Sequence, residues 1–267
     1  MFRLLAVQLH DYGCKVKRVK LQALLAVVCI CWCWPVLAQE APANLPLESQ
    51  APSIHIVFDG QCTEAGTCRV LLKNVSSHAA TDFLSSIVPT ETVPVKDNAV
   101  NGPIPAGGTF SFEASEQYGL LIQAVIFDDG SYEGDRKQAT YMAATRVGRW
   151  TQWERNRQRI DEIMAMDASD DYKLAMLREE VPKVPEDFEL ASHRFRKSYP
   201  TLSMSDPSTV DWLKGAMVSE KKVFIDTLGQ HVKFLEQHPS REETLAQWWA
   251  KVEQVASDAD PYNSAKK

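Results

Sequence analysis

Cysteine is scarce in most of this 267-residue chain, and the positions of the few present exclude a disulfide-rich scaffold. Four of the six lie within the first 38 residues: Cys14, Cys29, Cys31 and Cys33. The other two, Cys62 and Cys68, lack the C-x-x-C spacing of redox and zinc sites. We expect Cys62 and Cys68 to form one structural disulfide, with a metal or redox pair as the alternative.

The sequence also lacks the local motifs that identify common catalytic chemistries. It contains no G-x-S-x-G, H-E-x-x-H, G-x-x-x-x-G-K or G-x-G-x-x-G. Catalytic triads are assembled from residues distant in sequence, so this absence leaves an enzyme possible. The sequence therefore assigns no catalytic residue and no cofactor. The composition, 45% hydrophobic and 24% charged, is that of a globular protein and excludes a collagen-like or wholly disordered chain.

The first 38 residues have the pattern of a secretory signal. Residues 1–20 contain five basic residues and one acid, and residues 21–37 are uncharged and largely apolar. The segment Val36-Leu37-Ala38 then carries the small and aliphatic residues that a signal peptidase recognises. We expect cleavage near Ala38 and export to the periplasm or the medium. The alternative is an uncleaved anchor, because an apolar run of about 17 residues approaches the length of a membrane-spanning helix.

Net charge bears on the partners of the remaining chain. Five of the 29 basic and one of the 35 acidic residues lie before residue 39, so the rest carries 24 basic and 34 acidic residues, a net charge of −10. An acidic body repels phosphate backbones, which argues against nucleic acid as a partner. No run after residue 38 is apolar enough to cross a bilayer, so no stable membrane insertion is expected after cleavage.

The chain after the signal divides by pattern into a strand region and a helical region. Residues 39–52 are Pro-rich and aperiodic, which is typical of a tether. Residues 53–135 contain short alternating or apolar runs at 54–58, 68–75, 83–93, 109–113 and 120–127, separated by Gly, Pro and Asn. Such spacing predicts an antiparallel, immunoglobulin-like β-sandwich. With the helices that follow, the expected fold class is α+β.

Residues 136–257 contain only three glycines and show helical periodicity. We expect a helix over residues 136–166, a second one that is capped by Asp170 or Asp171 and runs through Arg178, and a third over residues 186–197. Asp206-Pro207 predicts the start of a long helix, and Ser240-Arg241-Glu242-Glu243 is a capping box before the last one. These helices are expected to pack as an irregular bundle, with residues 258–267 as a disordered tail.

One resemblance follows from three segments that occur in order. They are residues 71–76 (L-L-K-N-V-S), residues 104–110 (I-P-A-G-G-T-F) and residues 127–135 (F-D-D-G-S-Y-E-G-D). The chain resembles uncharacterised exported bacterial proteins with a small immunoglobulin-like sandwich that ends in F-x-D-G-S-x-E-G-D and continues into a helical tail. The resemblance covers roughly residues 53–159. It implies the sandwich fold and carries no activity.

Four carboxylates close together in sequence form the one metal candidate: Asp128, Asp129, Glu133 and Asp135. Oxygen-rich clusters can hold Ca²⁺, although this spacing is not that of an EF-hand. The alternative interpretation is structural. Asp129-Gly130 suits a tight turn, and the acids after it suit the start of a helix. The structural reading is preferred, and no metal is assigned.

The helical region contains six candidate partner-binding residues, which combine Arg with Trp: Arg149, Trp150, Trp153, Arg157, Trp248 and Trp249. Interleaved Arg and aromatic side chains can bind an acidic protein or single-stranded nucleic acid. The alternative is a solvated basic face paired with acidic segments near residues 167–171 and 179–180, with the Trp side chains in the core. Since Trp248 and Trp249 point about 100° apart on a helix, we expect one of them at a boundary.

These observations favour a non-enzymatic exported protein of the bacterial cell envelope that binds an unknown protein partner or acts as a scaffold. The alternative is a hydrolase or other enzyme with its site at the junction of the sandwich and the helices, where clefts commonly form.

Overall fold

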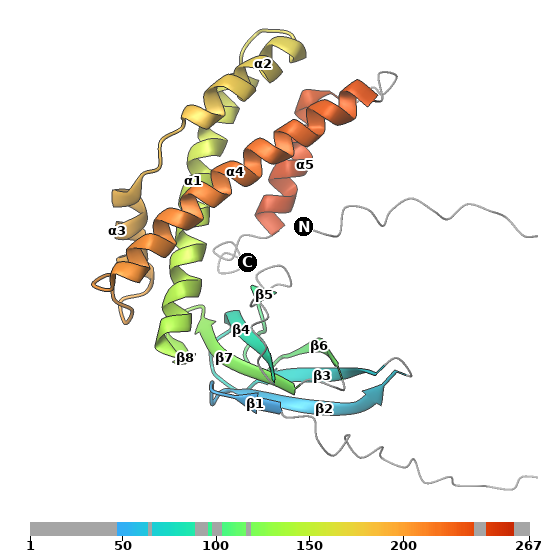
Figure 1. Ribbon diagram of the computed structural model, residues 1–267, viewed down its shortest axis with the longest axis vertical. Coiled ribbons are helices and arrows are strands. Elements are labelled where there is room, and N and C mark those ends of the chain that lie inside the picture. Colours follow the sequence, from blue (N-terminus) through green and yellow to red (C-terminus); the bar gives the residue numbers. More distant parts are fainter. Residues whose placement is uncertain are drawn as a thin grey trace, which may run out of the picture. The chain divides into compact units, whose positions relative to one another are not determined.

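A computed structural model describes residues 47–63, 66–88, 96–97, 103–115, 119–237 and 244–258. All of them belong to one compact unit, Ala38–Lys267. Within these residues the chain forms two β-sheets and five α-helices, so the mixed α+β class is confirmed (Figure 1). The expected signal, most of the tether and most of the C-terminal tail lie outside the described residues.

The two sheets are built mostly from antiparallel neighbours. The three-stranded sheet has the order β2-β3-β6, from the strands β2 (Ile54–Cys62), β3 (Thr67–Asn74) and β6 (Thr109–Ser115). The other sheet has the order β1-β7-β4-β5, with β8 also on β7, from the strands β1 (Leu47–Ser49), β4 (Ala80–Val88), β5 (Lys96–Asp97), β7 (Gly119–Phe127) and β8 (Tyr132–Gly134).

The strand β7 is apolar almost throughout because it serves two cores. Leu120 and Ile122 pack into the cluster between the sheets, whereas Ala124 and Ile126 pack against the helices. The pairing of β4 with β7 is irregular here, since Leu84 is opposite Ala124 and Ser85 is opposite Ile122. The even-numbered residues of β7 therefore face one core before this point and the other core after it. Because side chains alternate along a strand, one extra residue sends the following ones to the opposite face.

The strand β1 corrects two expectations from the sequence. It lies within residues 39–52, which were expected to be a tether, and it pairs with β7 in parallel, so the sheets are not wholly antiparallel. It aligns with Leu120–Ile122, and β8 aligns with Ala124–Ile126. Together the two short strands give hydrogen-bond partners to the edge of β7 that β4 leaves open. Unpaired backbone groups there would be costly, which overrides the weak β propensity of a Pro-rich segment.

The helices begin at residues with clear local signals. Their bounds are α1 (Arg136–Met164), α2 (Asp170–Glu180), α3 (Phe188–Ser198), α4 (Pro207–Gln237) and α5 (Leu245–Asp258), with a short 3₁₀ turn, η2 (Val181–Lys183), after α2. The Asp135 carboxylate accepts a 2.8 Å bond from the Gln138 amide, and Asp206 accepts one of 2.9 Å from the Ser208 amide. These caps stabilise the starts of α1 and α4, as the sequence predicts.

Two helix starts differ from the sequence expectation. The cap of α2 is Ser169, whose hydroxyl accepts from the Tyr172 amide, rather than Asp170 or Asp171. The expected capping box at residues 240–243 lies outside the described residues. A reciprocal pair is present four residues later, where Thr244 Oγ1 accepts from the Gln247 amide and Gln247 Oε1 accepts from the Thr244 amide. This pair is the capping box of α5.

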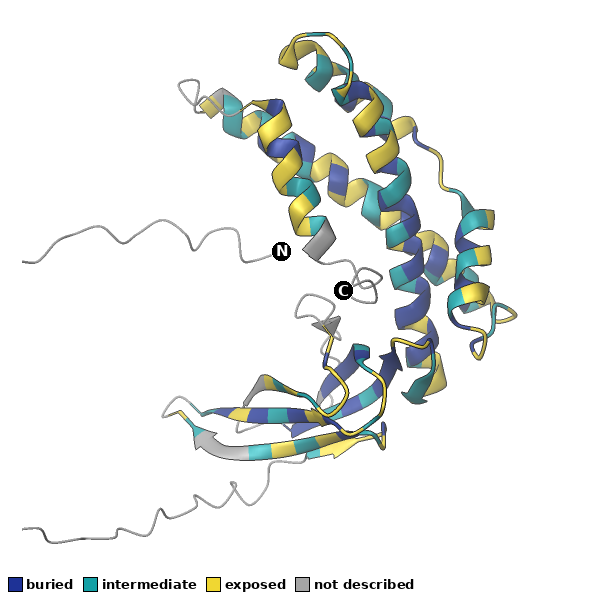
Figure 2. Cartoon of the chain, turned by 180° about the vertical axis from the view of Figure 1, so that it is seen from behind, coloured by how far each residue is buried: buried dark blue, intermediate teal, exposed yellow. Residues whose placement is uncertain are grey.

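One apolar cluster, the junction core, joins a sheet to the helices. It contains Leu84, Ala124 and Ile126 from the sheet, Met142 and Ala143 among others from α1, and further residues of α3 and α4. Figure 2 shows the run of buried residues along the first half of α1. A second cluster fills the space between the sheets, and a third lies among α1, α2, α4 and α5. Because the junction core is continuous, the sheets and the helices are packed on each other rather than strung on a linker.

Candidate functional site

The three best-buried tryptophans of the helical region lie in its core. Trp153, Trp248 and Trp249 are each at most 9% exposed. The rings of Trp153 and Trp249 are 5.8 Å apart, and the indole N–H of Trp249 donates to Asp161 Oδ1 at 3.1 Å. Trp248 stacks on the ring of His231 with 4.5 Å between centroids. These contacts hold α5 to its neighbours.

The expectation that either Trp248 or Trp249 lies at a boundary is therefore wrong. Adjacent residues on a helix do diverge by about 100°. However, α5 packs against two helices, with Trp249 facing Trp153 of α1 and Trp248 facing His231 of α4. Both directions are covered, so both side chains are buried.

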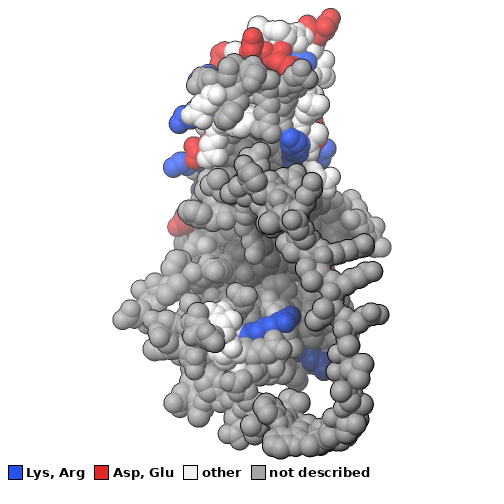
Figure 3. Space-filling view, turned by 90° about the vertical axis from the view of Figure 1, so that its right-hand side faces the viewer, with Lys and Arg blue, Asp and Glu red and all other residues white. Residues whose placement is uncertain are grey.

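The arginines of α1 connect it to each of the other helical segments. Arg149 pairs with Glu220 of α4 at 3.1 Å, and Arg157 pairs with Glu253 of α5 at 2.8 Å. Two further pairs reach α2 and the cap of α3: Arg159–Glu180 at 2.9 Å and Arg155–Asp187 at 3.1 Å. Figure 3 shows one face of the molecule, on which the described Lys and Arg side chains of the helical part lie among Asp and Glu.

These ion pairs shift the pKa values of the side chains that form them. Hydrogen bonds from Lys183 and Arg159 lower the pKa of Glu180, and the bonds of Lys183 to Glu179 and Glu180 raise the pKa of Lys183. The acidic partner of α1 at residues 179–180 was expected from the sequence. Asp170, in the other acidic segment, instead accepts a bond from the backbone amide of Leu245. Trp150, the remaining candidate, is half-buried against the helical core.

Two shallow hollows lie along α1, and neither is lined by a residue of the sheets. The first is lined by Arg155, Gln158, Arg159, Glu162, Glu180, Lys183, Val184 and Pro185, and the second by Glu154, Arg157, Gln158, Asp161 and Glu162. Most of the charged side chains that line them are ion-paired; besides the pairs above, Arg159 also pairs with Glu162, Arg157 with Asp161, and Arg194 with Glu154. At the junction between sheet and helices, Arg146 donates to Thr81 Oγ1 at 3.0 Å and Arg136 donates to the Thr201 carbonyl at 3.4 Å.

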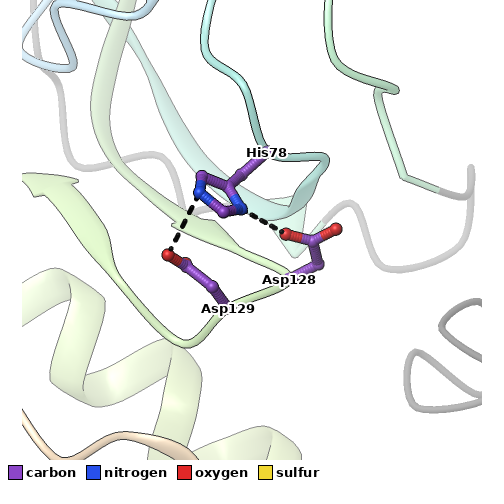
Figure 4. Close-up of side chains that lie close together, drawn as sticks. All are labelled: His78, Asp128 and Asp129. Atoms are coloured by element: carbon purple, nitrogen blue, oxygen red, sulfur yellow. Dashed lines mark hydrogen bonds and ion pairs between the residues drawn. The ribbon is translucent and has the colours of Figure 1, made fainter.

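The four carboxylates of the metal candidate have separate roles in the structure. Asp135 caps α1, and Glu133 accepts bonds from the amide and hydroxyl of Ser53 at 2.7 and 2.6 Å. Only Asp128 and Asp129 lie together, in the turn between β7 and β8. His78, from the loop before β4, lies between them (Figure 4).

We call His78, Asp128 and Asp129 the His78 triad. The Nδ1 atom of His78 is 3.2 Å from Asp128 Oδ1, and its Nε2 atom is 3.5 Å from Asp129 Oδ2. The three side chains are between 40% and 47% exposed. Desolvation raises the pKa of Asp129, but bonds from the hydroxyl and amide of Ser131 and the nearby His78 ring outweigh it, so this pKa is lowered.

The two loops that carry the triad are held by backbone contacts. The amide of Asp128 donates to the Ala79 carbonyl at 2.9 Å, which ties the turn to the residue after His78. The fully buried Asn74 donates from Nδ2 to the carbonyls of His78 and Ile104. Gly130, in the same turn as Asp128 and Asp129, has a φ of 81°, and a Cβ there would overlap the carbonyl oxygen of Ser198.

Sequence reasoning identified both aspartates and missed His78. No local spacing could have revealed it, because His78 precedes Asp128 by 50 residues and meets it only through the pairing of β4 with β7.

Cys62 and Cys68 face each other across β2 and β3, with a Cα–Cα distance of 3.9 Å. Their sulfur atoms are within disulfide-bonding distance. The fold thus brings together the two cysteines that were expected to pair.

Comparisons with known proteins reveal no relative: no family model matches the chain, and neither curated proteins nor solved structures show a match. Among the residues that the structure describes, no helix has the length and apolar character that crossing a membrane requires.

Proposed function

We propose that the protein is a non-enzymatic, exported scaffold or interaction protein of the bacterial cell envelope, in which an immunoglobulin-like sandwich and a helical region act as one body. The observation that carries this proposal is the junction core. Leu84, Ala124 and Ile126 of the sheet share one apolar cluster with α1, α3 and α4, so a partner on either part would be held in a fixed relation to the other.

The strand order supports an immunoglobulin-like sandwich. In that fold, strands A, B and E share one sheet, and strands C, F and G share the other. The orders β2-β3-β6 and β5-β4-β7-β8 correspond to A-B-E and C′-C-F-G, with consecutive strands assigned in chain order. Side chains from both sheets, including Val70, Leu72, Phe83 and Ile122, fill one cluster between them.

The contacts of the α1 arginines support a scaffold role for this helix. Each of four arginines joins α1 to a different helical segment, and the tryptophans beside them are used in the core. A binding surface would then consist of other exposed side chains. Exposed apolar residues occur on both sheet and helices; those on α1 and α4 are Tyr141, Val218, Val223 and Ile225. Three further ones lie on separate elements and serve as probes: Val57 on β2, Tyr172 on α2 and Val255 on α5.

Site-specific photo-crosslinking tests the proposal and maps the surface. A photoreactive residue is placed at Val57, Tyr172 or Val255, and irradiated cell envelopes are examined by mass spectrometry. The proposal predicts one recurrent protein adduct from one of the three positions and none from the other two. Deleting residues 136–267 is a poorer test, since it would expose the apolar side chains of the junction core. Absence of any adduct, together with turnover of a small substrate by the purified chain, would overturn the proposal in favour of an enzyme.

Export is tested separately by the mass of the protein in the envelope fraction. The proposal predicts a chain that begins at Gln39. A full-length chain in the membrane fraction would instead establish an uncleaved anchor.

A further inference from the structure

We propose that His78 and Asp129 bind a zinc ion at the surface of the sandwich, with Asp128 orienting the imidazole. This site is independent of the proposed scaffold function. The donors come from two loops, the one before β4 and the turn between β7 and β8, and their ligand atoms all lie within 4.8 Å of one another.

The distance between two of these atoms matches zinc geometry. Zinc binds His nitrogen and carboxylate oxygen at about 2.0–2.2 Å in a tetrahedral arrangement, so two of its ligands lie about 3.3–3.5 Å apart. The separation of His78 Nε2 and Asp129 Oδ2 is 3.5 Å. An ion can therefore be held between them with little movement, and water completes the coordination on the exposed side.

Asp128 has the position of an orienting carboxylate. Histidines that bind zinc usually donate their other ring N–H to a carboxylate, which fixes the tautomer and the ring orientation. Here Asp128 Oδ1 is 3.2 Å from Nδ1 of His78. A proton on Nδ1 leaves the lone pair on Nε2, which is 3.5 Å from Asp129 Oδ2. Asp129 is itself held, because its Oδ1 accepts from the amide and hydroxyl of Ser131 at 2.9 and 2.6 Å.

The backbone places these groups before any ion arrives. Asn74, which is fully buried, holds the carbonyl of His78 at 2.8 Å, and the Asp128 amide is bonded to the Ala79 carbonyl. A site on preformed loops loses less conformational entropy on binding than one on free chain. The nitrogen donor selects zinc over Ca²⁺, which prefers oxygen ligands throughout.

The test is a zinc titration by isothermal calorimetry on residues 39–267. This chain corresponds to the compact unit Ala38–Lys267 without its first residue, and it omits the four N-terminal cysteines, which would compete for zinc. The proposal predicts one bound Zn²⁺ that excess Ca²⁺ does not displace. His78→Ala and Asp129→Asn weaken binding by at least about tenfold, and Asp128→Asn weakens it by roughly 10–100-fold through loss of orientation.

His55→Ala is the matched control, since His55 is an exposed histidine on β2 that does not belong to the triad. It is expected to leave zinc binding unchanged. Ring ¹⁵N chemical shifts of His78 give a second readout: zinc shifts Nε2, and Nδ1 retains its proton. All three triad residues are exposed, so their variants are expected to keep the thermal stability of the parent chain. The proposal is overturned if no zinc binds, if His78→Ala binds as tightly as the parent, or if His55→Ala loses as much affinity. In that case the His78 ring only pairs with the two aspartates.

Discussion

Gly148 of α1 lies directly against the backbone of Leu213 in α4. A Cβ at Gly148 would be 2.5 Å from the Leu213 carbonyl oxygen and 2.9 Å from the Cβ of Ala216. Real Cβ atoms do not approach other atoms this closely, so only glycine allows the two longest helices to pack at this distance. The close crossing holds α4 to α1 beside the junction core.

The Gly148→Ala variant is therefore expected to be destabilised by about 1–2 kcal/mol. Overpacking costs about 1–3 kcal/mol, and the higher helix propensity of Ala recovers up to about 1 kcal/mol. Urea denaturation measures the difference.

Gly215→Ala is the control within α4, because a Cβ there meets nothing within 4 Å. It is expected to stabilise the protein by about 0.4–1 kcal/mol. If both variants stabilise the chain equally, the helices do not pack as closely as described.

The role of Trp249 distinguishes a core residue from a binding residue. Trp249 is 5% exposed and contacts Trp153, Phe224 and Asp161, so Trp249→Ala is expected to lower the free energy of unfolding by about 3–5 kcal/mol. Tyr172 is 54% exposed, so Tyr172→Ala is expected to change the free energy of unfolding by less than about 0.5 kcal/mol. A Trp249→Ala variant with unchanged stability would restore the partner-binding interpretation of this side chain.

The bond between Glu133 and Ser53 joins residues 80 positions apart and ties β8 to the start of β2. Hydrogen bonds to a charged group contribute about 1.5–3 kcal/mol. Glu133→Gln keeps the shape of the side chain but removes its charge, and is expected to lower the free energy of unfolding by about 1–2 kcal/mol. In a double-mutant cycle with Ser53→Ala, the two changes should be less than additive. Strict additivity in thermal or urea unfolding would mean that the two side chains do not interact.

Acid sensitivity is expected at Glu186, which pairs with Lys221 of α4 at 2.6 Å. The hydrogen bond from Lys221 lowers the pKa of Glu186 below its ordinary value of 4.5, although desolvation opposes the shift. A group whose pKa is lowered on folding stabilises the protein above its unfolded pKa, and this contribution disappears as the pH falls through the folded pKa. Because the carboxylate is about one-third exposed, the contribution is at most about 1 kcal/mol.

Glu186→Gln is accordingly expected to be slightly less stable than the parent chain at pH 7. The difference should shrink as the pH falls below 4.5, the ordinary pKa of Glu, and vanish once the pH lies below the lowered pKa of Glu186 in the folded chain. Urea unfolding at a series of pH values measures it, with the exposed Glu189→Gln on α3 as the control. A Glu186→Gln deficit that persists unchanged at low pH would show that the ion pair is not its cause.

Local signals in the sequence determined where most elements begin. Asp135 and Asp206-Pro207 predict the starts of α1 and α4, since a cap acts within three residues of itself. The apolar run at residues 120–127 predicts a buried strand for the same local reason, and β7 occupies Gly119–Phe127. Weak signals failed in two places. The cap of α2, Ser169, is one or two residues earlier than expected, and β1 forms within the expected tether because β7 offers it an open edge.

The pairing of distant side chains was decided only by the tertiary structure. Composition and spacing identified Arg157, Trp248 and Trp249 as notable, but not that α5 would lie against two helices and bury both tryptophans. Asp128 and Asp129 were visible as a turn, whereas His78 reaches them only through the register of β4 on β7. Caps and turns depend on neighbours in sequence, so the sequence by itself predicts them. Register and helix packing depend on how whole faces fit together, and a one-residue shift changes every contact.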